Sequence, residues 1–239
     1  MERDINIYHC CTQKTASRWF KVFFEHEIFQ KYCPLEVSSY QEVRWEDPET
    51  PGRIFFALYT DWEHFVKMPK PEKHKFFFML RDPRDVVVSW YYSVRYSHAV
   101  MGQIGDWRKC LSKLPMEAGL KYSIRKLQRM GYFEKQKSWV KNAPKESIFT
   151  YEYFCKKQFN FFYWKLFKRL GIEMPKEELS RLLKECSFKA ITGRRRGIEN
   201  RQSNYRKGMP GDWMEHFSVD VYKYFREMTD NVHEELGYE

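Results

Sequence analysis

The chain has 239 residues, of which 43% are hydrophobic, so a buried core is feasible and wholesale disorder is disfavoured. Its formal net charge is +10, which favours an anionic partner such as nucleic acid, a membrane surface or a phosphate-rich small ligand. No apolar run approaches the roughly 18 to 20 residues of a membrane-spanning helix, and the N-terminus "MERDINIYHC" is no secretory signal, so we expect a soluble cytoplasmic protein.

Short apolar runs alternate with longer helical patterns along the chain. Runs such as "RIFFALY" and "KFFFML" are typical of strands in a parallel sheet that is covered on both faces. The predicted strands are Ile5–Tyr8, Leu35–Ser38, Arg53–Tyr59, Lys75–Leu80 and Ser147–Tyr151. The predicted helices are Ser17–Lys31, Arg84–Ser97, Met116–Met130, Phe133–Lys141, Glu152–Leu170, Lys176–Glu185 and Val219–Leu236. This alternation predicts an α/β fold with a central parallel sheet flanked by helices.

The first polar segment, "HCCTQKTASRWF", joins a predicted strand to a predicted helix. Lys14 lies in the loop and the helix starts near Ser17, a layout in which the first N–H groups and the helix dipole favour a negative charge. The loop has no glycine, so it is not the GxxxxGKS or GxxxxGKT loop of ordinary ATPases and GTPases. Taken alone, it is equally well explained as a polar loop between two core elements.

The second segment is "FFFMLRDPRDVVVSWYYS", in which a strand ends at Arg81 and a helix begins at the following proline turn. Arg81 can grip a phosphate with two hydrogen bonds, and the hydroxyl of Ser89 follows two helical turns later. The alternative is a salt-bridged corner in which Arg81 pairs with Asp82 or Asp85.

The third segment, "YRKGMPGDWMEHF", contains two cations, Arg206 and Lys207, followed by Gly208. Glycine lets the main chain approach a ligand closely. The alternative is an ordinary surface loop. Just before it, "TGRRRGIENRQSN" is polar and flanked by glycine, so we expect Arg194–Arg196 to belong to a mobile loop that a ligand orders.

The order of the three segments is more specific than any one of them. Strand–"PKSGTTW"–helix, strand–"RDPRDVVVS"–helix and a late "RKGxxGDWxxxF" occur in this order in one family. The sequence resembles the sulfotransferases that use 3′-phosphoadenosine 5′-phosphosulfate (PAPS), the cytosolic type in particular, from the first strand to Phe217. The first motif is the looser match, with Ala16 in place of Gly and Arg18 in place of Thr. The resemblance implies one P-loop-like sulfotransferase domain over residues 1–239, with PAPS as co-substrate and no metal.

The resemblance also implies a role for each matching residue. Lys14 matches the family's catalytic Lys, whose ammonium can neutralise charge on the leaving phosphate. Phe188 and Trp19 would stack near the adenine. The implied nucleotide contacts are Lys14, Thr15, Ala16, Ser17, Arg18 and Trp19 at the 5′-phosphosulfate, Arg81, Ser89, Arg206, Lys207 and Gly208 at the 3′-phosphate, and Tyr151, Ser187 and Phe188 at the adenosine side.

An acceptor hydroxyl also needs a base, and the family's "KTHLP" histidine is absent here. The comparable strand reads "RIFFALYTDWEHFVKMP", so we rank Asp61 and His64 nearly equal as catalytic candidates, with Glu63 behind. The alternative for all three is a solvated helix start with Asp61 as N-cap. An amine acceptor would need a different base. His9 and His98 are expected to be structural.

The expected partner is a small-molecule acceptor, with neither nucleic acid nor a membrane as partner. Aromatic residues reach 18%, and most of them should pack in the core, while a few could line a pocket for a ring-bearing acceptor. The six cysteines match neither a CxxC metal pair nor a disulfide framework, so reduced thiols are expected. Three alternatives remain: a kinase-like P-loop protein, a nucleic-acid-binding module that uses Arg194–Arg196, and a degenerate sulfotransferase that binds nucleotide without catalysis.

Overall fold

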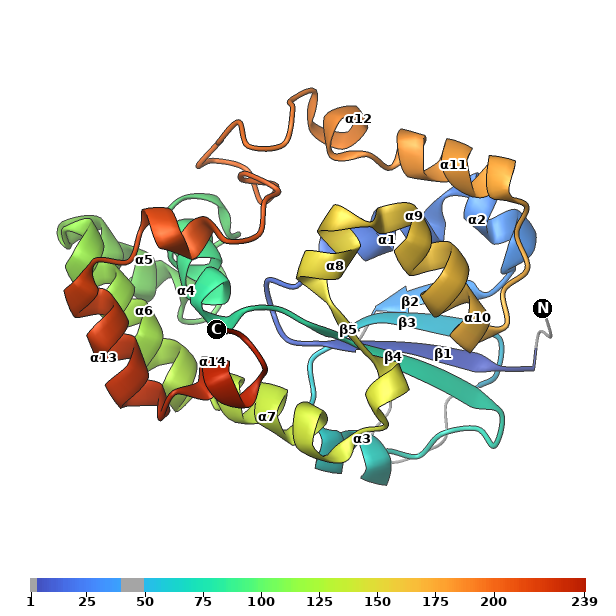
Figure 1. The fold of residues 1–239 in the computed structure, drawn as a ribbon, viewed down its shortest axis with the longest axis horizontal. Coiled ribbons are helices and arrows are strands. Elements are labelled where there is room, and N and C mark those ends of the chain that lie inside the picture. The colour runs from blue at the N-terminus through green and yellow to red at the C-terminus, as the bar shows by residue number, and fades with distance from the viewer. Residues whose placement is uncertain (1–3, 40–49) are drawn as a thin grey trace.

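The computed structural model describes residues 4–39 and 50–239 (Figure 1). Five strands form one sheet in the order β2-β3-β1-β4-β5, and every neighbouring pair is parallel. The strands are β1 (Asn6–Cys11), β2 (Glu36–Ser39), β3 (Arg53–Leu58), β4 (His74–Leu80) and β5 (Ile148–Thr150). The predicted parallel sheet is confirmed, and the main difference is that the first strand continues beyond Tyr8 to Cys11.

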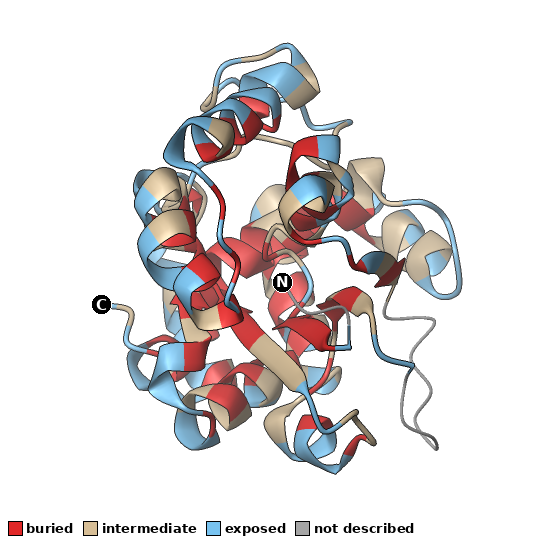
Figure 2. Ribbon diagram, turned by 90° about the vertical axis from the view of Figure 1, so that its right-hand side faces the viewer, coloured by how far each residue is buried: buried red, intermediate tan, exposed pale blue. Residues whose placement is uncertain are grey.

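The strands are apolar on both faces because helices cover both faces. In β1, Ile7 and Cys11 belong to one core cluster while Tyr8 and Cys10 belong to the other, as the alternation of side chains along a strand requires. The residues of β4 divide between the two clusters in the same way. Figure 2 shows the buried residues concentrated on the strands and on the helix faces that pack against them.

The first core cluster joins the sheet to helices from the start and the later middle of the chain. These are α1 (Ser17–Glu25), α2 (Glu27–Tyr32), α8 (Tyr151–Lys156), α9 (Gln158–Asn160), the π-helical turn η4 (Phe161–Leu166), α10 (Phe167–Leu170), α11 (Lys176–Glu185) and α12 (Phe188–Thr192). In Figure 1 this group lies above the sheet.

The second core cluster joins the opposite face to the remaining helices. These are α3 (Trp62–Lys67), α4 (Pro83–Tyr92), the π-helical turn η2 (Ser93–Ser97), α5 (Ile104–Lys113), α6 (Met116–Arg129), α7 (Tyr132–Asn142), the 3-10 turns η3 (Lys145–Ser147) and η5 (Asp212–Glu215), α13 (Val219–Thr229) and α14 (Val232–Glu235). None of the described helices is long and apolar enough to cross a membrane.

Three predicted helices are interrupted. Ser17–Lys31 is two helices because His26 adopts an extended backbone and its ring accepts a hydrogen bond from the N–H of Ile28, which starts α2. Glu152–Leu170 breaks where Lys157 leaves the helical region, and then continues as a π-helical turn. Val219–Leu236 breaks at two consecutive residues with left-handed backbone, Asp230 and Asn231.

Other helix predictions differ less. The helix predicted over Arg84–Ser97 begins at Pro83 and becomes π-helical at Ser93. The two central predictions agree with α6 and α7 to within one residue at each end, and the prediction of Lys176–Glu185 matches α11. The helices α5 and α12 were not predicted, and α3 was considered only as the alternative explanation for Asp61.

Candidate active site

The loop between β1 and α1 has the backbone of an anion-binding site. Lys14 and Ala16 both have left-handed backbone, with φ of 70° and 68°. Non-glycine residues adopt this conformation rarely, and it is concentrated at functional sites because the cost must be offset by the surroundings. Ala16 is the N-cap of α1 and offers no side-chain acceptor, so no side chain caps the first N–H groups of this helix. An anion at this position would complement them.

Three hydroxyl groups, those of Thr12, Tyr132 and Thr15, stabilise this loop. The Thr12 hydroxyl donates to the hydroxyl of Tyr132 on α7 at 2.6 Å, and Tyr132 donates in turn to the carbonyl of Gln13 at 2.6 Å. The hydroxyl of Thr15 donates to the carbonyl of Thr12, also at 2.6 Å. Thr15 is fully buried and its oxygen is used by the loop itself, so it supports the shape of the loop.

Positive charge converges on Lys14. Burial lowers the pKa of Lys14, and the neighbouring cations Arg81, Arg18 and Arg206 act in the same direction, so that together they bring it to about 7. Three of the segments that the sequence singled out therefore lie close enough to act on one ammonium group. Such a cluster is unfavourable by itself and becomes favourable when an anion is bound among the cations.

Arg81 lies at the centre of this cluster. Its Nη1 donates to the carbonyl of Lys14 at 3.0 Å, its Nη2 donates to Asp85 at 3.2 Å, and its guanidinium lies 4.3 Å from the ring centre of Tyr151. Burial would lower the pKa of Arg81, but Asp85, with smaller contributions from Tyr151, Glu152 and Cys155, raises it above its ordinary value. The buried Nε of Arg81 has no hydrogen-bond partner among the described residues, which leaves one donor for a ligand.

Asp85 links the Arg81 corner to the late segment. Its side chain is fully buried, and besides Arg81 it accepts hydrogen bonds from the N–H groups of Gly211 and Trp213, each at 2.9 Å. The salt-bridged corner that was the alternative explanation for Arg81 is thus present. It does not exclude a ligand, because the pair uses only part of the guanidinium.

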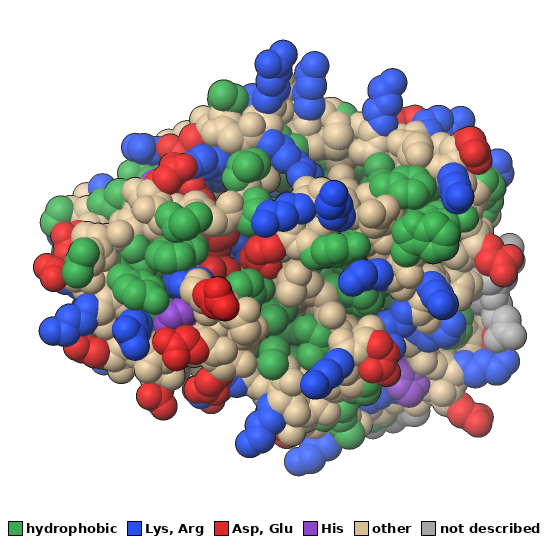
Figure 3. All heavy atoms as spheres, in the orientation of Figure 1, with side chains coloured by type: hydrophobic (Ala, Val, Ile, Leu, Met, Phe, Trp, Pro, Cys, Tyr) green, Lys and Arg blue, Asp and Glu red, His purple; other side chains and the backbone are tan. Residues whose placement is uncertain are grey.

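The late segment carries its own counter-charges. Arg206 pairs with Glu199 at 2.5 Å and with Asp212, and its guanidinium lies 4.3 Å from the ring centre of Tyr92. Lys207 pairs with Asp212 at 2.6 Å and with Glu215. These carboxylates fix the positions of Arg206 and Lys207. The charge of Arg206 nevertheless contributes to the lowering of the Lys14 pKa. Figure 3 shows Lys and Arg side chains along the top of this face, over α11, α12 and the loop that follows.

The same segment contains a possible set of metal ligands, because Asp212, Glu215 and His216 bring ligand atoms within 4.8 Å of one another. Arg206 and Lys207 already donate to the carboxylates of this set. A metal ion would have to displace both cations, so ion pairing explains the cluster better than metal binding.

Arg194 and Arg196 have protein partners. Arg194 donates to the carbonyls of Ile198, Tyr205 and Arg206, at 2.5, 2.6 and 3.0 Å. Arg196 donates to the carbonyl of Cys155 at 3.0 Å. These contacts join the segment to its own loop and to the end of α8, and the expectation that a ligand orders this segment stays a prediction, to be checked by protease sensitivity with and without nucleotide.

Two of the residues expected at the adenosine side, Ser187 and Phe188, lie at the start of α12, next to Gly208, which was expected at the 3′-phosphate. Gly208 has left-handed backbone, and a Cβ built there would lie 2.6 Å from the ring of Phe188, so these two predicted residues are in contact. The hydroxyl of Ser187 caps α12 by accepting from the N–H of Ala190. Trp19 is nearly buried among phenylalanines of the first core cluster, and its indole N–H donates to the carbonyl of Cys186 at 2.7 Å. Its packing leaves little of the ring for a ligand.

Ser89 is partly exposed on α4 and Tyr151 is buried beneath Arg81. Arg18 is exposed at the second position of α1. The structure thus joins Lys14, Arg81 and Tyr151 by direct contact, and it brings Arg18 and Arg206 near Lys14.

The two candidate bases are bonded to each other instead of to this cluster. Asp61 caps α3 by accepting from the N–H of His64 at 2.8 Å, and its carboxylate also lies 2.7 Å from Nδ1 of the His64 ring. Burial would raise the pKa of Asp61, but these hydrogen bonds from His64 outweigh it and lower the pKa. His64 is 73% exposed. Glu63 accepts from Ser138 and Asn142 on α7, and buried His9 packs between Phe20 and Phe77.

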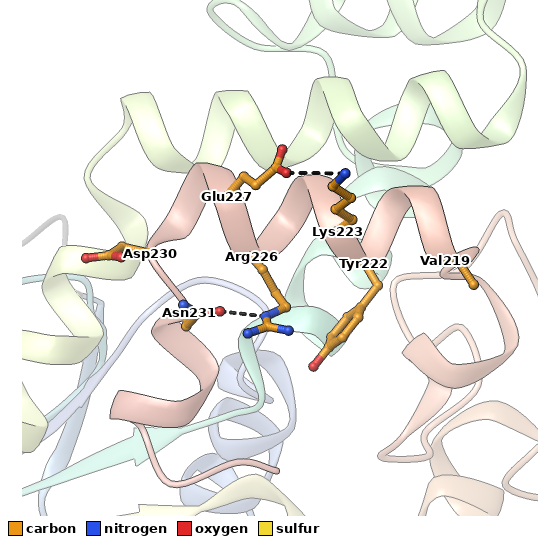
Figure 4. A pocket seen from close by; sticks show the side chains of 7 residues that line it. All are labelled: Val219, Tyr222, Lys223, Arg226, Glu227, Asp230 and Asn231. Atoms are coloured by element: carbon orange, nitrogen blue, oxygen red, sulfur yellow. Dashed lines mark hydrogen bonds and ion pairs between the residues drawn. The ribbon is translucent and has the colours of Figure 1, made fainter.

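The clearest hollows of the described surface are elsewhere. One is lined by α13 and the turn that follows it, where Lys223 pairs with Glu227 and Arg226 donates to Asn231 (Figure 4). The other lies between α3 and α7 and includes Asp61 and Lys135. No residue expected to bind nucleotide lines either hollow, so the site is defined by convergent cations and not by cavity size.

Sequence reasoning missed several residues that support the site. Asp85 was visible as the second acid of "RDPRD" but was considered only as a partner of Arg81. Tyr132, Tyr92 and Tyr59 had no signal in the sequence, because their contacts join residues far apart along the chain.

The sheet is parallel, the start of α1 offers uncapped N–H groups between two strand ends, and a buried arginine lies beside it. These features define a P-loop-like protein that binds phosphorylated ligands. Residues 13–237 match the model of the sulfotransferase domain family, so the chain belongs to that family. It is 26% identical over 200 residues to sulfotransferase 2B1 of Rattus norvegicus, a match that covers 79% of this chain and 54% of the relative. It is 25% identical over 208 residues to sulfotransferase 2A1 of Homo sapiens, covering 79% of this chain and 68% of the relative.

Two solved structures show the same fold. The mouse sulfotransferase SULT7A1 complexed with PAP superposes with a TM-score of 0.61 at 16% identity, covering 98% of this chain and 89% of the other. Retinol dehydratase in complex with retinol and PAP gives a TM-score of 0.58 at 15% identity, covering 97% and 82%. The chain spans only about half the length of the first curated relatives that it matches.

Proposed function

We propose that this chain acts as one sulfotransferase domain that moves a sulfuryl group from PAPS to a hydroxyl of a small-molecule acceptor, with the soluble cytoplasm as its setting. The observation on which this proposal rests is the convergence of Arg81, Arg18 and Arg206 on Lys14, whose pKa is lowered to about 7 by burial and, to a smaller extent, by these three cations. Family membership supplies the reaction class.

The residues present fit the desulfated donor, 3′-phosphoadenosine 5′-phosphate (PAP). The start of α1 and Lys14 would hold the 5′-phosphate end, and the unpaired Nε of Arg81 together with Ser89 and Arg206 would hold the 3′-phosphate. Phe188 would lie against the adenine, and Gly208, which contacts the Phe188 ring, would lie beside the 3′-phosphate. Both solved structures contain PAP, the desulfated form of PAPS, and this supports PAPS as the donor here.

In the transfer, the acceptor oxygen, the sulfur and the leaving phosphate oxygen must lie in line. Lys14 would neutralise the charge that grows on the bridging oxygen, and Arg18, exposed one helical position beyond Ser17, would hold sulfuryl oxygens. A hydroxyl acceptor is supported by the names of relatives, which include the 3-beta-hydroxysteroid sulfotransferase of Cavia porcellus and a dehydratase bound to retinol.

The test is a thermal shift with PAP, ATP and a single-stranded oligonucleotide in parallel, together with formation of PAP from PAPS. We expect a large stabilisation by PAP at moderate salt and a smaller one by ATP. Stabilisation by the oligonucleotide that collapses as salt rises would favour nucleic-acid binding instead. Binding of PAP without turnover of PAPS would favour a degenerate, non-catalytic member of the family.

The affinity for PAP is expected to fall as the pH rises through about 7. A bound dianion raises the pKa of Lys14, so binding takes up a proton whenever Lys14 is neutral in the free protein. The loss should approach about tenfold per pH unit and level off above the pKa of the complex. Isothermal titration over this range checks it, and Lys14→Gln should remove this dependence.

A further inference from the structure

The loop that carries Lys14 has different neighbours on its two sides. β1 lies between β3 and β4 in the sheet, so the loop after β1 is flanked by the ends of both strands. On the β4 side, Arg81 donates to the carbonyl of Lys14. On the β3 side, Tyr59 directly follows the strand, and its hydroxyl lies 3.1 Å from the hydroxyl of Ser17, the first residue of α1.

These two sides differ in chemistry. The β4 side contains the arginines and the late segment, which suit the phosphates of the nucleotide. The β3 side presents a partly exposed phenol that contacts the helix start where the sulfuryl donor would bind. An acceptor that approaches the sulfur opposite the leaving phosphate therefore has the β3 side available to it.

The residues next along the chain are less suited to this position. The carboxylate of Asp61 is committed to the N–H and ring of His64, and His64 is mostly exposed to solvent. Neither has a hydrogen bond to the loop over residues 12–17 in the part of the chain that the structure describes, whereas Tyr59 has one.

We propose that Tyr59 is the catalytic residue on the acceptor side, and that the Tyr59–Ser17 hydroxyl pair passes the acceptor's proton toward the leaving phosphate. This inference rests on the proposed sulfuryl transfer and replaces the base that sequence reasoning placed at Asp61 or His64. Either hydroxyl of the pair can be the donor, so the hydrogen bond can reverse its direction during the reaction.

The step balances without a charged base. The acceptor oxygen forms a bond to sulfur, the bond from sulfur to the bridging oxygen breaks, and its electron pair stays on the 5′-phosphate. The acceptor hydroxyl gives its proton to the oxygen of Tyr59, Tyr59 gives its own proton to Ser17, and Ser17 gives its proton to the phosphate. The products are the sulfate ester and singly protonated PAP, which then releases the proton to water.

The experiment compares Tyr59→Phe with wild type on two acceptors of different acidity, measuring PAP formed from PAPS. Benzyl alcohol is a very weak acid and needs the relay to lose its proton, so kcat of Tyr59→Phe with this acceptor should fall about 100-fold or more. 4-Nitrophenol ionises readily and should show little loss. PAP affinity should be unchanged, because the phenol belongs to the acceptor side. Ser17→Ala should repeat the acceptor-dependent loss, and Ser17→Thr should restore activity.

Tyr224→Phe on α13, where Lys121 lies 6.0 Å from the ring centre, is the matched control and should behave as wild type. Equal losses on both acceptors, or no loss on either, would overturn the relay, as would an acceptor-dependent loss in His64→Ala instead of Tyr59→Phe. If wild type itself forms no PAP with either acceptor or with water, the proposed function fails and the relay fails with it.

Discussion

Replacing Lys14 by alanine is expected to lower kcat for sulfuryl transfer by about 100- to 1,000-fold, the usual effect of removing one group that stabilises developing charge. Lys14 lies in a loop with left-handed backbone at Lys14 and Ala16. This backbone fixes the direction in which the Lys14 side chain leaves the loop. Because the charge on the bridging oxygen develops during the reaction and remains on the 5′-phosphate of PAP, kcat should fall and the affinity for PAP should fall with it.

The measurement is single-turnover formation of the sulfate ester, with PAP affinity from titration in parallel. Lys21→Ala is the matched control, since Lys21 lies in α1, just after the loop, and contacts exposed Glu25 at 3.6 Å and the ring of Phe56 rather than the cation cluster. Arg18→Ala should show an intermediate loss. Unaltered turnover in Lys14→Ala would remove Lys14 from the mechanism, and a large loss of PAP affinity with unchanged kcat would reduce its role to binding.

The loop and the strand end that we propose to bind phosphate were predictable because their positions depend on local signals. A strand followed by a polar loop and a helix places Lys14 at the carboxyl edge of a parallel sheet, and "RDPRD" places Arg81 at the same edge one strand away. Two such segments must meet in a parallel sheet, which is why the contact between Arg81 and the Lys14 carbonyl follows from the fold.

The contact between Tyr59 and Ser17, on the proposed acceptor side, was not predictable in the same way. The hydroxyl of Tyr59 reaches Ser17 across 42 positions of sequence, and that of Tyr132 reaches Gln13 across 119. Neither contact leaves a periodic or compositional signal. The acids near Tyr59 attracted attention because their side chains titrate, but helix capping accounts for the bonding of Asp61.

The helix breaks were missed for a related reason. The apolar pattern continues through His26 and Lys157, while the backbone at both residues leaves the helical region. At His26 the ring caps the next helix, and hydrophobic periodicity carries no information about such a backbone change. The consequence for the site is small, since the start of α1 and the end of β4 were located to the residue.

Replacing Arg81 by alanine is expected to weaken PAP binding by about 1.5 to 3 kcal/mol, the scale of a charged hydrogen bond. The Arg81 side chain is 9% exposed, and its Nε has no hydrogen-bond partner among the described residues. This N–H is the donor that we expect the 3′-phosphate to use. The change should also lower the free energy of unfolding, because Asp85 would stay buried with only the N–H groups of Gly211 and Trp213 as donors.

Arg84→Ala separates these two effects. Arg84 forms an equally buried ion pair with Asp82 at 2.8 Å and lies over the ring of Trp213, but it is not among the cations that lower the pKa of Lys14. Arg84→Ala should lower the free energy of unfolding, measured with urea, and leave PAP affinity unchanged. Titration with AMP, which lacks the 3′-phosphate, completes the test. Arg81→Ala should weaken PAP binding more than AMP binding, and an equal loss for both would move Arg81 from the 3′-phosphate to the 5′ end beside Lys14.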